Sequence, residues 1–153
     1  MKPTPADLRI DRDGRWYANG LQVVHEKIFD LFCKSLIREN GTYFIRIGEQ
    51  INPVIVEDVP FSVRGLYVEN TEDGNDIIRL LLNDGRTIDL DPVTLRAVDE
   101  MSVYCGIPGT NMEAKFSKDA LPMFSRYLEQ DDTSGGYYLE INGNRYDLFN
   151  ENP

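Results

Sequence analysis

Five apolar residues that recur at a constant offset constrain the fold of this chain more than any other feature of its sequence. Both sets have the three- and four-residue spacing that places side chains on one face of a helix. A strand-like segment follows each set, at 41–45 and at 136–140. The pattern predicts an α+β fold built from two repeated helix-on-antiparallel-sheet motifs that pack together. The first set is Val24, Ile28, Leu31, Phe32 and Leu36, and the second, 92 positions later (116 − 24), is Phe116, Ala120, Met123, Phe124 and Leu128.

A polar segment near the middle of the chain separates the two predicted motifs. Residues 70–76 interrupt the apolar pattern and include Asp73-Gly74, a pair typical of turns. We therefore place an N-terminal α+β half at 1–69 and a C-terminal α+β half at 70–153. Because a chain of 153 residues makes two small halves, we expect them to depend on one another and to pack as one rigid body.

Local signals predict two helices and a series of hairpins. Asn19-Gly20 and Asn142-Gly143 each accept the positive φ angles of a tight hairpin turn. One helix is predicted over 25–38 and ended by Asn40-Gly41, and a second begins after Ser117 as its cap. The remaining predicted elements are a meander of 43–47, 51–56 and 61–68 with Pro53 at the sheet edge, the hairpin 77–82 with 86–90, a short helical turn after Asp91-Pro92, strands at 101–105 and 112–116, and the hairpin 137–141 with 145–148.

The charge of the chain excludes some classes of partner. It contains 26 acidic residues against 16 basic ones, which gives a formal net charge of −10. Such a chain repels the phosphates of nucleic acids and anionic lipid head groups. We therefore expect neither nucleic acid nor a membrane as a partner. The N-terminus lacks the apolar core of a signal peptide, and no run approaches the roughly 20 apolar residues of a membrane span, so the sequence predicts a cytoplasmic protein.

Histidine and cysteine are too scarce for most metal or nucleophile sites. His25 is the single histidine, which excludes a histidine-based zinc cluster and predicts a role at the start of the first helix. Cys33 would lie roughly 12 Å from it along a continuous helix. We expect Cys33 and Cys105 to be small buried apolar side chains rather than a disulfide. The sequence predicts no catalytic set, no metal site and no cofactor.

Five polar or aromatic residues are candidates for ligand binding, and each also has a structural interpretation. Glu57 and Asp58 are adjacent on a strand, so their side chains point to opposite faces and cannot act as an acid–base pair without a bulge. Asp58 is expected to fix the next turn by accepting backbone hydrogen bonds. The alternative is that one of these acids lines a polar pocket with Arg46 or Arg64. Trp16 either lines a small-ligand pocket beside the first helix or fills the core, and core packing is the stronger expectation.

Several short motifs between Ile10 and Glu69 are shared with a known family. With these motifs the chain resembles the bacterial domain of unknown function family 1285, and beyond Glu69 the likeness is one of element order. The resemblance implies an α+β fold built from a repeated motif and a role in signalling, with no established activity and no catalytic residue to carry over. The motifs are Asp13-Gly14-Arg15-Trp16, Asn19-Gly20, Leu31-Phe32, Gly41-Thr42-Tyr43-Phe44 and Val56-Glu57-Asp58-Val59-Pro60-Phe61.

Together these observations favour a non-enzymatic module of the bacterial cytoplasm that binds a small molecule or a protein, with a regulatory or signalling role. We expect the ligand on a concave sheet surface or in the groove between the halves, bordered by Arg46, Glu57, Asp58 and Arg64. A structural subunit of a homo-oligomeric assembly is one alternative. The other is a small enzyme that uses carboxylates and arginines, with Glu57, Asp58, Asp89 and Asp91 as its acids.

Overall fold

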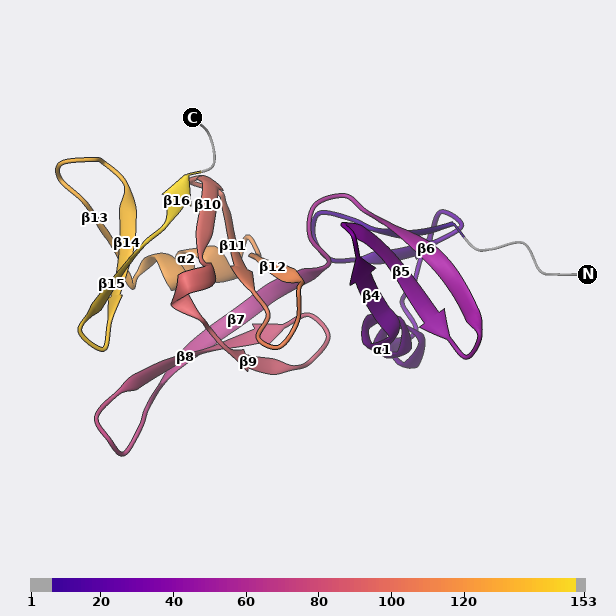
Figure 1. The fold of residues 1–153 in the computed structure, drawn as a ribbon, viewed down its shortest axis with the longest axis horizontal. Coiled ribbons are helices and arrows are strands. Elements are labelled where there is room, and N and C mark those ends of the chain that lie inside the picture. Colours follow the sequence, from indigo (N-terminus) through magenta and orange to yellow (C-terminus); the bar gives the residue numbers. More distant parts are fainter. Residues whose placement is uncertain (1–6, 151–153) are drawn as a thin grey trace, which may run out of the picture. The chain divides into compact units, whose positions relative to one another are not determined.

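The computed structural model describes residues 7–150, and the chain divides into two compact units (Figure 1). The N-terminal unit is Met1–Pro60 and the C-terminal unit is Phe61–Pro153. This division lies before the predicted boundary at Asn70, because residues 61–70 form a strand that pairs within the C-terminal unit. The polar segment after Asn70 is therefore a hairpin turn inside that unit and not a link between halves.

The N-terminal unit consists of a six-stranded sheet, sheet A, and one helix. The order across the sheet is β3-β2-β1-β6-β5-β4, and neighbouring strands are antiparallel except β1 and β6, which are parallel. Helix α1 (Glu26–Ser35) joins β3 to β4 and packs against β5. The strands are β1 (Leu8–Ile10), β2 (Trp16–Ala18), β3 (Leu21–Gln22), β4 (Leu36–Glu39), β5 (Thr42–Ile47) and β6 (Gln50–Val56).

One face of sheet A forms the core of the N-terminal unit under α1. Side chains alternate along the strands, so Leu8 and Ile10 are buried whereas Arg9 between them is exposed. The Trp16 ring is only 1% exposed, and its centroid lies 5.3 Å from that of Phe32 on α1. These rings fill the space between helix and sheet, where burial stabilises by about 25 cal/mol per Å² of apolar surface.

Helix α1 is shorter than predicted and is followed directly by a strand. It ends at Ser35, and Leu36 is already extended with φ −70° and ψ 131°. Asn40-Gly41, predicted as the stop of the helix, instead forms the two-residue turn between β4 and β5, with φ angles of 52° and 77°. Asn19-Gly20 and Asn142-Gly143 form the predicted hairpin turns, also with positive φ at both residues.

The predicted meander is wrong in its third strand. β6 pairs with β5 and with β1, whereas β7 (Phe61–Asn70) belongs to a sheet of the C-terminal unit. The predicted edge position of Pro53 is wrong as well, because β6 lies inside sheet A. The pairing of β6 with β1 begins at Val54, one residue after Pro53. The proline, which has no N–H to donate, therefore lies just outside the parallel ladder.

The C-terminal unit contains a seven-stranded sheet, sheet B, and a three-stranded sheet, sheet C. Sheet B has the order β16-β10-β11-β12-β7-β8-β9, and sheet C has the order β13-β14-β15. Neighbouring strands are antiparallel except β7 with β12 and β10 with β16, which are parallel. Besides β7, the elements are β8 (Asp76–Leu82), β9 (Thr87–Asp89), the 3₁₀ turn η1 (Pro92–Thr94), β10 (Arg96–Asp99), β11 (Ser102–Gly106), β12 (Glu113–Phe116), α2 (Ala120–Ser125), β13 (Leu128–Gln130), β14 (Tyr137–Ile141), β15 (Asn144–Asp147) and β16 (Phe149–Asn150).

Helix α2 packs on sheet B and completes the core of the C-terminal unit. The fully buried ring of Phe124 stacks on Phe116 of β12, with centroids 4.5 Å apart. Ser117 caps the first turn as predicted, because its Oγ accepts a hydrogen bond from the Ala120 N–H at 3.1 Å. Pro122 lies in the same turn. Backbone N–H groups in the first turn have no acceptor within the helix, so the missing N–H of proline removes no hydrogen bond there.

The structure does not confirm the repeated helix-on-sheet motif. Positions related by the offset differ in environment: Val24 is 78% exposed and precedes α1, whereas Phe116 is 2% exposed and belongs to β12. Ile28 is 44% exposed on α1, whereas Ala120 on α2 is fully buried. The fold is α+β, as predicted, with more strand than helix. The apolar spacing recurs in the sequence, but the residues that share it lie in different environments in the two units.

The two cysteines are both buried and both free thiols, as expected. Burial, with a contribution from the Glu113 carboxylate, raises the pKa of Cys105 to about 12. Its thiol therefore stays protonated at neutral pH and packs as a small apolar group.

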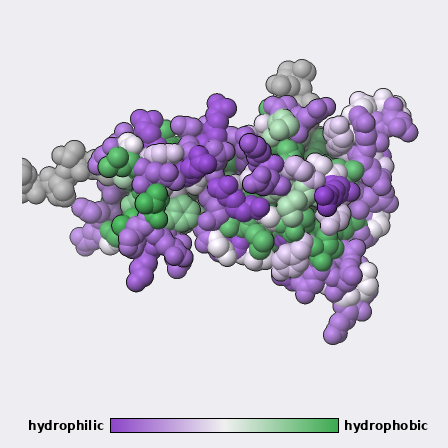
Figure 2. Space-filling model, turned by 180° about the vertical axis from the view of Figure 1, so that it is seen from behind, coloured by the Kyte–Doolittle hydropathy of each residue, from purple (hydrophilic) through white to green (hydrophobic). Residues whose placement is uncertain are grey.

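The face drawn in Figure 2 is mostly hydrophilic, with apolar side chains interspersed among the polar ones. Neither α1 nor α2, the α-helices of residues 7–150, combines the length and the apolar character that crossing a bilayer requires.

Candidate functional site

Two adjoining cavities next to β10 in the C-terminal unit form the candidate site. Their volumes are about 300 Å³ and about 400 Å³, at the lower end of the range of small-molecule sites. Ala97, Asp99, Glu100, Tyr137 and Leu148 border both, so we treat the two as one site, the β10 cavity. Its other lining residues are Val98, Met101, Val103, Leu121, Ser125, Leu128, Gly135 and Gly136.

The hairpin of β10 and β11 forms one wall and the acidic border of the β10 cavity. Ala97 and Val103 are paired across the two strands, so their side chains share one face of sheet B. The register then shifts between Ala97 and Asp99, and this β-bulge brings four consecutive residues, 97–100, to the cavity. Asp99 also fixes the turn, because its Oδ1 accepts a hydrogen bond from the Met101 N–H at 2.8 Å. The exposed carboxylates of Asp99 and Glu100 thus stand at the border of the cavity.

Helix α2 forms the second wall. Leu121 and Ser125 are separated by one helical turn and both line the cavity. The Ser125 Oγ donates a hydrogen bond to the Leu121 carbonyl oxygen at 2.8 Å, so its proton is used within the helix. The single histidine of the chain is His25, in the N-terminal unit, so the C-terminal unit has no imidazole to activate this hydroxyl. Ser125 is therefore a polar lining group of the cavity whose hydroxyl proton is donated within α2.

Sheet C and the segment after it form the third wall. Leu128 is the first residue of β13 and Tyr137 is the first residue of β14, and both line the cavity. Leu148 is buried and is held beside β14 by a hydrogen bond from its N–H to the Tyr137 carbonyl oxygen at 3.0 Å. The Tyr137 side chain is 39% exposed, which leaves it available for contact with a ligand.

The lining residues define the chemistry that the β10 cavity accommodates. Aliphatic side chains from β11, α2 and β13 supply apolar walls, and Asp99 and Glu100 supply negative charge at the border. No arginine or lysine is among the lining residues. Within residues 7–150, no three His, Cys, Asp or Glu side chains are grouped so as to hold a metal ion. The cavity therefore suits a small cation that carries an apolar body.

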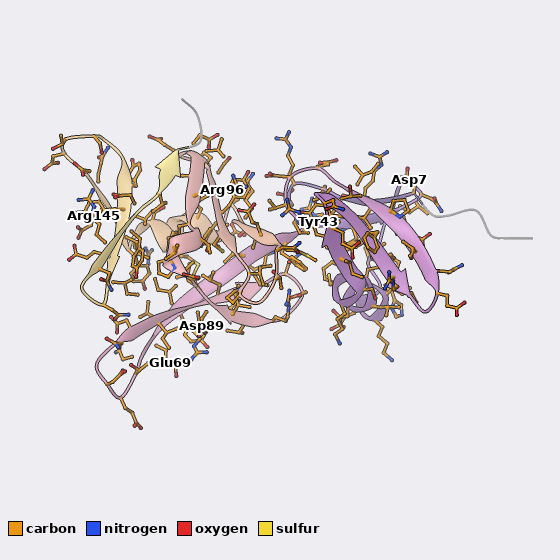
Figure 3. All side chains as sticks on the ribbon, viewed as in Figure 1. Asp7, Tyr43, Glu69, Asp89, Arg96 and Arg145 are labelled. Atoms are coloured by element: carbon orange, nitrogen blue, oxygen red, sulfur yellow. The ribbon has the colours of Figure 1, made fainter. Side chains whose placement is uncertain are left out.

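An ion-pair network ties together the strands of sheet C. Arg145 on β15, which is labelled in Figure 3, pairs with Asp147 and with Asp131, and its guanidinium carbon lies 3.8 Å from the centroid of the Tyr138 ring. The hydrogen bond from Arg145 is the largest cause that lowers the pKa of Asp131, and hydrogen bonds from backbone N–H groups in the following turn add to it.

We expect this network to weaken in acid. Because the folded pKa of Asp131 is depressed, its contribution to stability is present above the ordinary value of 3.8 and is lost as the pH falls through the lower folded value. A carboxyl-carbon NMR titration is expected to find the Asp131 pKa below 3.8 in the wild-type protein and closer to 3.8 in Arg145→Gln. The same pKa in both proteins would show that Arg145 is not the cause.

The residues of the N-terminal unit that were predicted to bind a ligand do not line the β10 cavity. Arg46 is exposed on β5, and Trp16 is enclosed in the core beside α1. Glu57 is exposed just after β6, where its N–H donates a hydrogen bond to the Ile10 carbonyl oxygen at 2.9 Å. Asp58 is half-buried in the following turn. Their role in binding stays a prediction.

The other predicted residues lie in the C-terminal unit and also lie away from the cavity lining. Arg64 is exposed on β7, where the pairing with β8 shifts register. Asp89 forms an ion pair with Arg79 at 3.1 Å, and Arg79 also contacts Glu69 at 2.8 Å; the two acids are labelled in Figure 3. Asp91 accepts a hydrogen bond at 3.2 Å from the N–H of the second residue of η1, which is the predicted cap. Asp89 and Asp91 therefore already have structural partners.

Reasoning from the sequence did not identify the β10 cavity. The apolar spacing predicts the second helix and the apolar residues at 101–105 predict a strand, but neither pattern shows that the two segments meet. The one local signal was Asp99-Glu100, two acids in a turn between apolar segments. Such pairs are common in solvent-exposed turns, so the signal has little specificity.

Comparisons with known proteins bear on the fold. No family model matches the sequence, and no curated protein matches it. Among solved structures, a DUF1285 family protein from Silicibacter pomeroyi matches 96% of this chain and 81% of its own, with a TM-score of 0.78 and 20% identity. A DUF1285 family protein from Shewanella baltica matches 79% of this chain and 91% of its own, with a TM-score of 0.63 and 20% identity. The chain therefore has the fold of the DUF1285 family, the family that its N-terminal motifs resemble.

Proposed function

We propose that this protein is a non-enzymatic binding module and that the β10 cavity is its ligand site. The observation that carries the proposal is the lining, which combines apolar walls from three segments with two carboxylates at one border. A fitting ligand has an ammonium or guanidinium group attached to a short apolar body. Its apolar body supplies most of the affinity, at about 25 cal/mol per Å² buried, and the carboxylates at the border supply selectivity for positive charge.

The proposal includes a regulatory role, which the separate origins of the cavity walls support. The β10–β11 hairpin, α2 and β14 are separated in the sequence, and a ligand in the cavity contacts all three. Binding then stabilises their shared arrangement by mass action. A partner protein that binds this arrangement of the three segments would then bind the liganded and unliganded protein with different affinity. This supports a signalling or regulatory module over a passive carrier.

The enzyme alternative has less support. Of its four proposed acids, Glu57, Asp58, Asp89 and Asp91, none lines the β10 cavity. The acids that do line the cavity are consecutive in one exposed turn, and one of them is already an acceptor for a backbone N–H. A binding site needs charge at such a border, whereas acid–base catalysis needs carboxyl groups placed on either side of a reacting atom.

The test of the proposal compares two probes of the same size and opposite charge. Hexylammonium is expected to bind the wild-type protein, as seen by native mass spectrometry and by a rise in Tm, and hexanoate is not. Two variants separate charge from shape. Asp99→Asn with Glu100→Gln removes both charges but keeps an oxygen acceptor for the Met101 N–H, and Ser125→Phe fills the space beside α2.

We expect the charge variant to weaken hexylammonium binding by about 2- to 30-fold, as the loss of two ion pairs worth 0.2–1 kcal/mol each predicts. Ser125→Phe is expected to weaken hexylammonium binding as well, because it fills the space beside α2. The matched control, Glu72→Gln with Asp132→Asn, changes net charge equally at exposed positions outside the lining and is expected to bind as the wild type does. Equal affinity for the two probes, or no effect of either cavity variant, contradicts the proposal.

A further inference from the structure

Tyr137 lies on the side of sheet C that faces the β10 cavity. Side chains alternate along β14, so Tyr137 shares one face of the sheet with Leu139, and Tyr138 lies on the opposite face. Leu139 is buried and is paired with Leu128, which lines the cavity. The Tyr137 side chain is therefore directed to the cavity side of sheet C, and Tyr137 borders both parts of the cavity.

The ring of Tyr137 is not covered by a cation of the protein, in contrast to the ring of its neighbour. On the other face of sheet C, the Arg145 guanidinium carbon lies 3.8 Å from the centroid of the Tyr138 ring. Across residues 7–150, the Tyr137 ring has no aromatic or cationic partner, and its hydroxyl makes no hydrogen bond. The face of an aromatic ring attracts cations through its quadrupole. Tyr137 thus offers a surface for a cation at the border of the cavity.

The two acids at the same border are not neutralised by a basic side chain. Asp99 and Glu100 are exposed, and no ion pair among the described residues includes either of them. Exposed carboxylates attract positive charge, but water and salt screen them, so each ion pair is worth little. The carboxylates therefore favour cations in general and do not select among different kinds of cation.

Backbone acceptors on the sheet C side of the cavity are already used within the protein. The Gly136 carbonyl oxygen accepts a hydrogen bond from the Asp131 N–H at 2.7 Å, and the Tyr137 carbonyl oxygen accepts one from the Leu148 N–H at 3.0 Å. A primary ammonium group donates three hydrogen bonds, and in the cavity it would lose bonds to water that this lining does not replace. A quaternary ammonium group has no N–H to satisfy, and its methyl groups suit apolar walls and an aromatic ring.

We infer that the β10 cavity selects quaternary ammonium ligands over primary amines and that Tyr137 is the residue that determines this specificity. The inference rests on the proposed function, because it names the ligand class of the same cavity. The methylated headgroup packs on the Tyr137 ring, and the carboxylates of Asp99 and Glu100 balance its charge from the border. The alkyl chain of the ligand lies along the aliphatic walls.

The test compares hexyltrimethylammonium with hexylammonium, which have the same alkyl chain and the same charge. Isothermal titration calorimetry of the whole protein is expected to show that hexyltrimethylammonium binds at least about threefold more tightly. Tyr137→Leu keeps an apolar side chain but removes the ring. We expect it to weaken hexyltrimethylammonium binding by about 2- to 30-fold and to bring the two affinities closer together. Tyr137→Phe keeps the ring and is expected to keep the preference.

The matched control is Tyr67→Leu, which removes an exposed tyrosine on β7 outside the cavity lining and is expected to keep the wild-type preference. Because Tyr137 is itself partly exposed, its variants are expected to fold, which circular dichroism checks. Equal affinity of the wild-type protein for the two ions overturns this inference and leaves the proposed function standing. So does a preference that Tyr137→Leu keeps in full. If neither ion binds, the proposed function fails and the inference fails with it.

Discussion

Replacing Phe124 with alanine is expected to lower the free energy of unfolding of the C-terminal unit by about 3–5 kcal/mol. Phe124 is 0% exposed and stacks on Phe116 with an interplanar angle of 16°, so the substitution leaves a cavity between α2 and sheet B. Denaturation by urea, followed by circular dichroism, measures the loss. Phe124→Leu, which keeps most of the volume, is the matched control and is expected to cost less than about half as much.

The same substitution also connects stability to the candidate site. Leu121 and Ser125, which line the β10 cavity, are on the same short helix as Phe124. We therefore expect Phe124→Ala to weaken hexylammonium binding even under conditions in which the unit remains folded. A destabilisation below about 1 kcal/mol would mean that α2 does not depend on this ring contact.

Replacing Trp16 with alanine is expected to cost about 3–5 kcal/mol in the N-terminal unit. Its side chain is 1% exposed and lies against Phe32 of α1, so the substitution removes this ring contact between α1 and the hairpin of β1 and β2. Circular dichroism is the suitable measurement, because Trp16 is the single tryptophan of the chain and the variant has no tryptophan fluorescence.

Trp16→Phe separates packing from the polar group of the indole. Within the described residues, the buried Trp16 Nε1–H has no hydrogen-bond acceptor, so its removal relieves an unsatisfied donor while the ring contact is partly kept. We expect Trp16→Phe to cost clearly less than Trp16→Ala. If both variants were as stable as the wild type, Trp16 would not be a core residue, and its predicted role in a ligand pocket would gain support.

Local rules account for the elements that were predicted correctly. The turns at Asn19-Gly20 and Asn142-Gly143, the Ser117 cap and the Asp91 cap each depend on groups within a few residues of one another. Asn40-Gly41 shows the limit of such rules. The same pair of positive φ angles serves a helix stop and a hairpin turn, and β4 decides between them by pairing with β5.

The partners of strands that are distant in the chain were the part of the fold that the sequence did not indicate, whereas the hairpin partners were predicted. Two of the parallel pairings among residues 7–150, β1 with β6 and β7 with β12, join strands that are far apart in the chain. They place β6 inside sheet A, and they assign β7 to the C-terminal unit, so that the division falls after Pro60. A meander predicted from three successive apolar segments contains no information about these distant partners.

The candidate site was even less accessible to sequence reasoning. Its walls come from β10, β11, α2, β13 and β14, and each contributes side chains that also match the pattern of an ordinary core. Glu57-Asp58 and Asp99-Glu100 are both pairs of adjacent acids, and the sequence does not show which pair lies beside apolar side chains from distant segments. Ile28 and Leu31 of the first apolar set are exposed on α1, and their spacing does not show which face of the helix a sheet covers.

By itself the sequence determined where turns, caps and alternating segments occur and that the fold is α+β, because those features depend on conformational preferences and hydrogen bonds between near neighbours. The tertiary structure alone decided which distant strands pair, which face of each helix is covered and which side chains enclose a cavity. These outcomes depend on burying surfaces from distant segments against one another, and that free energy belongs to the assembled unit and to no single stretch of chain.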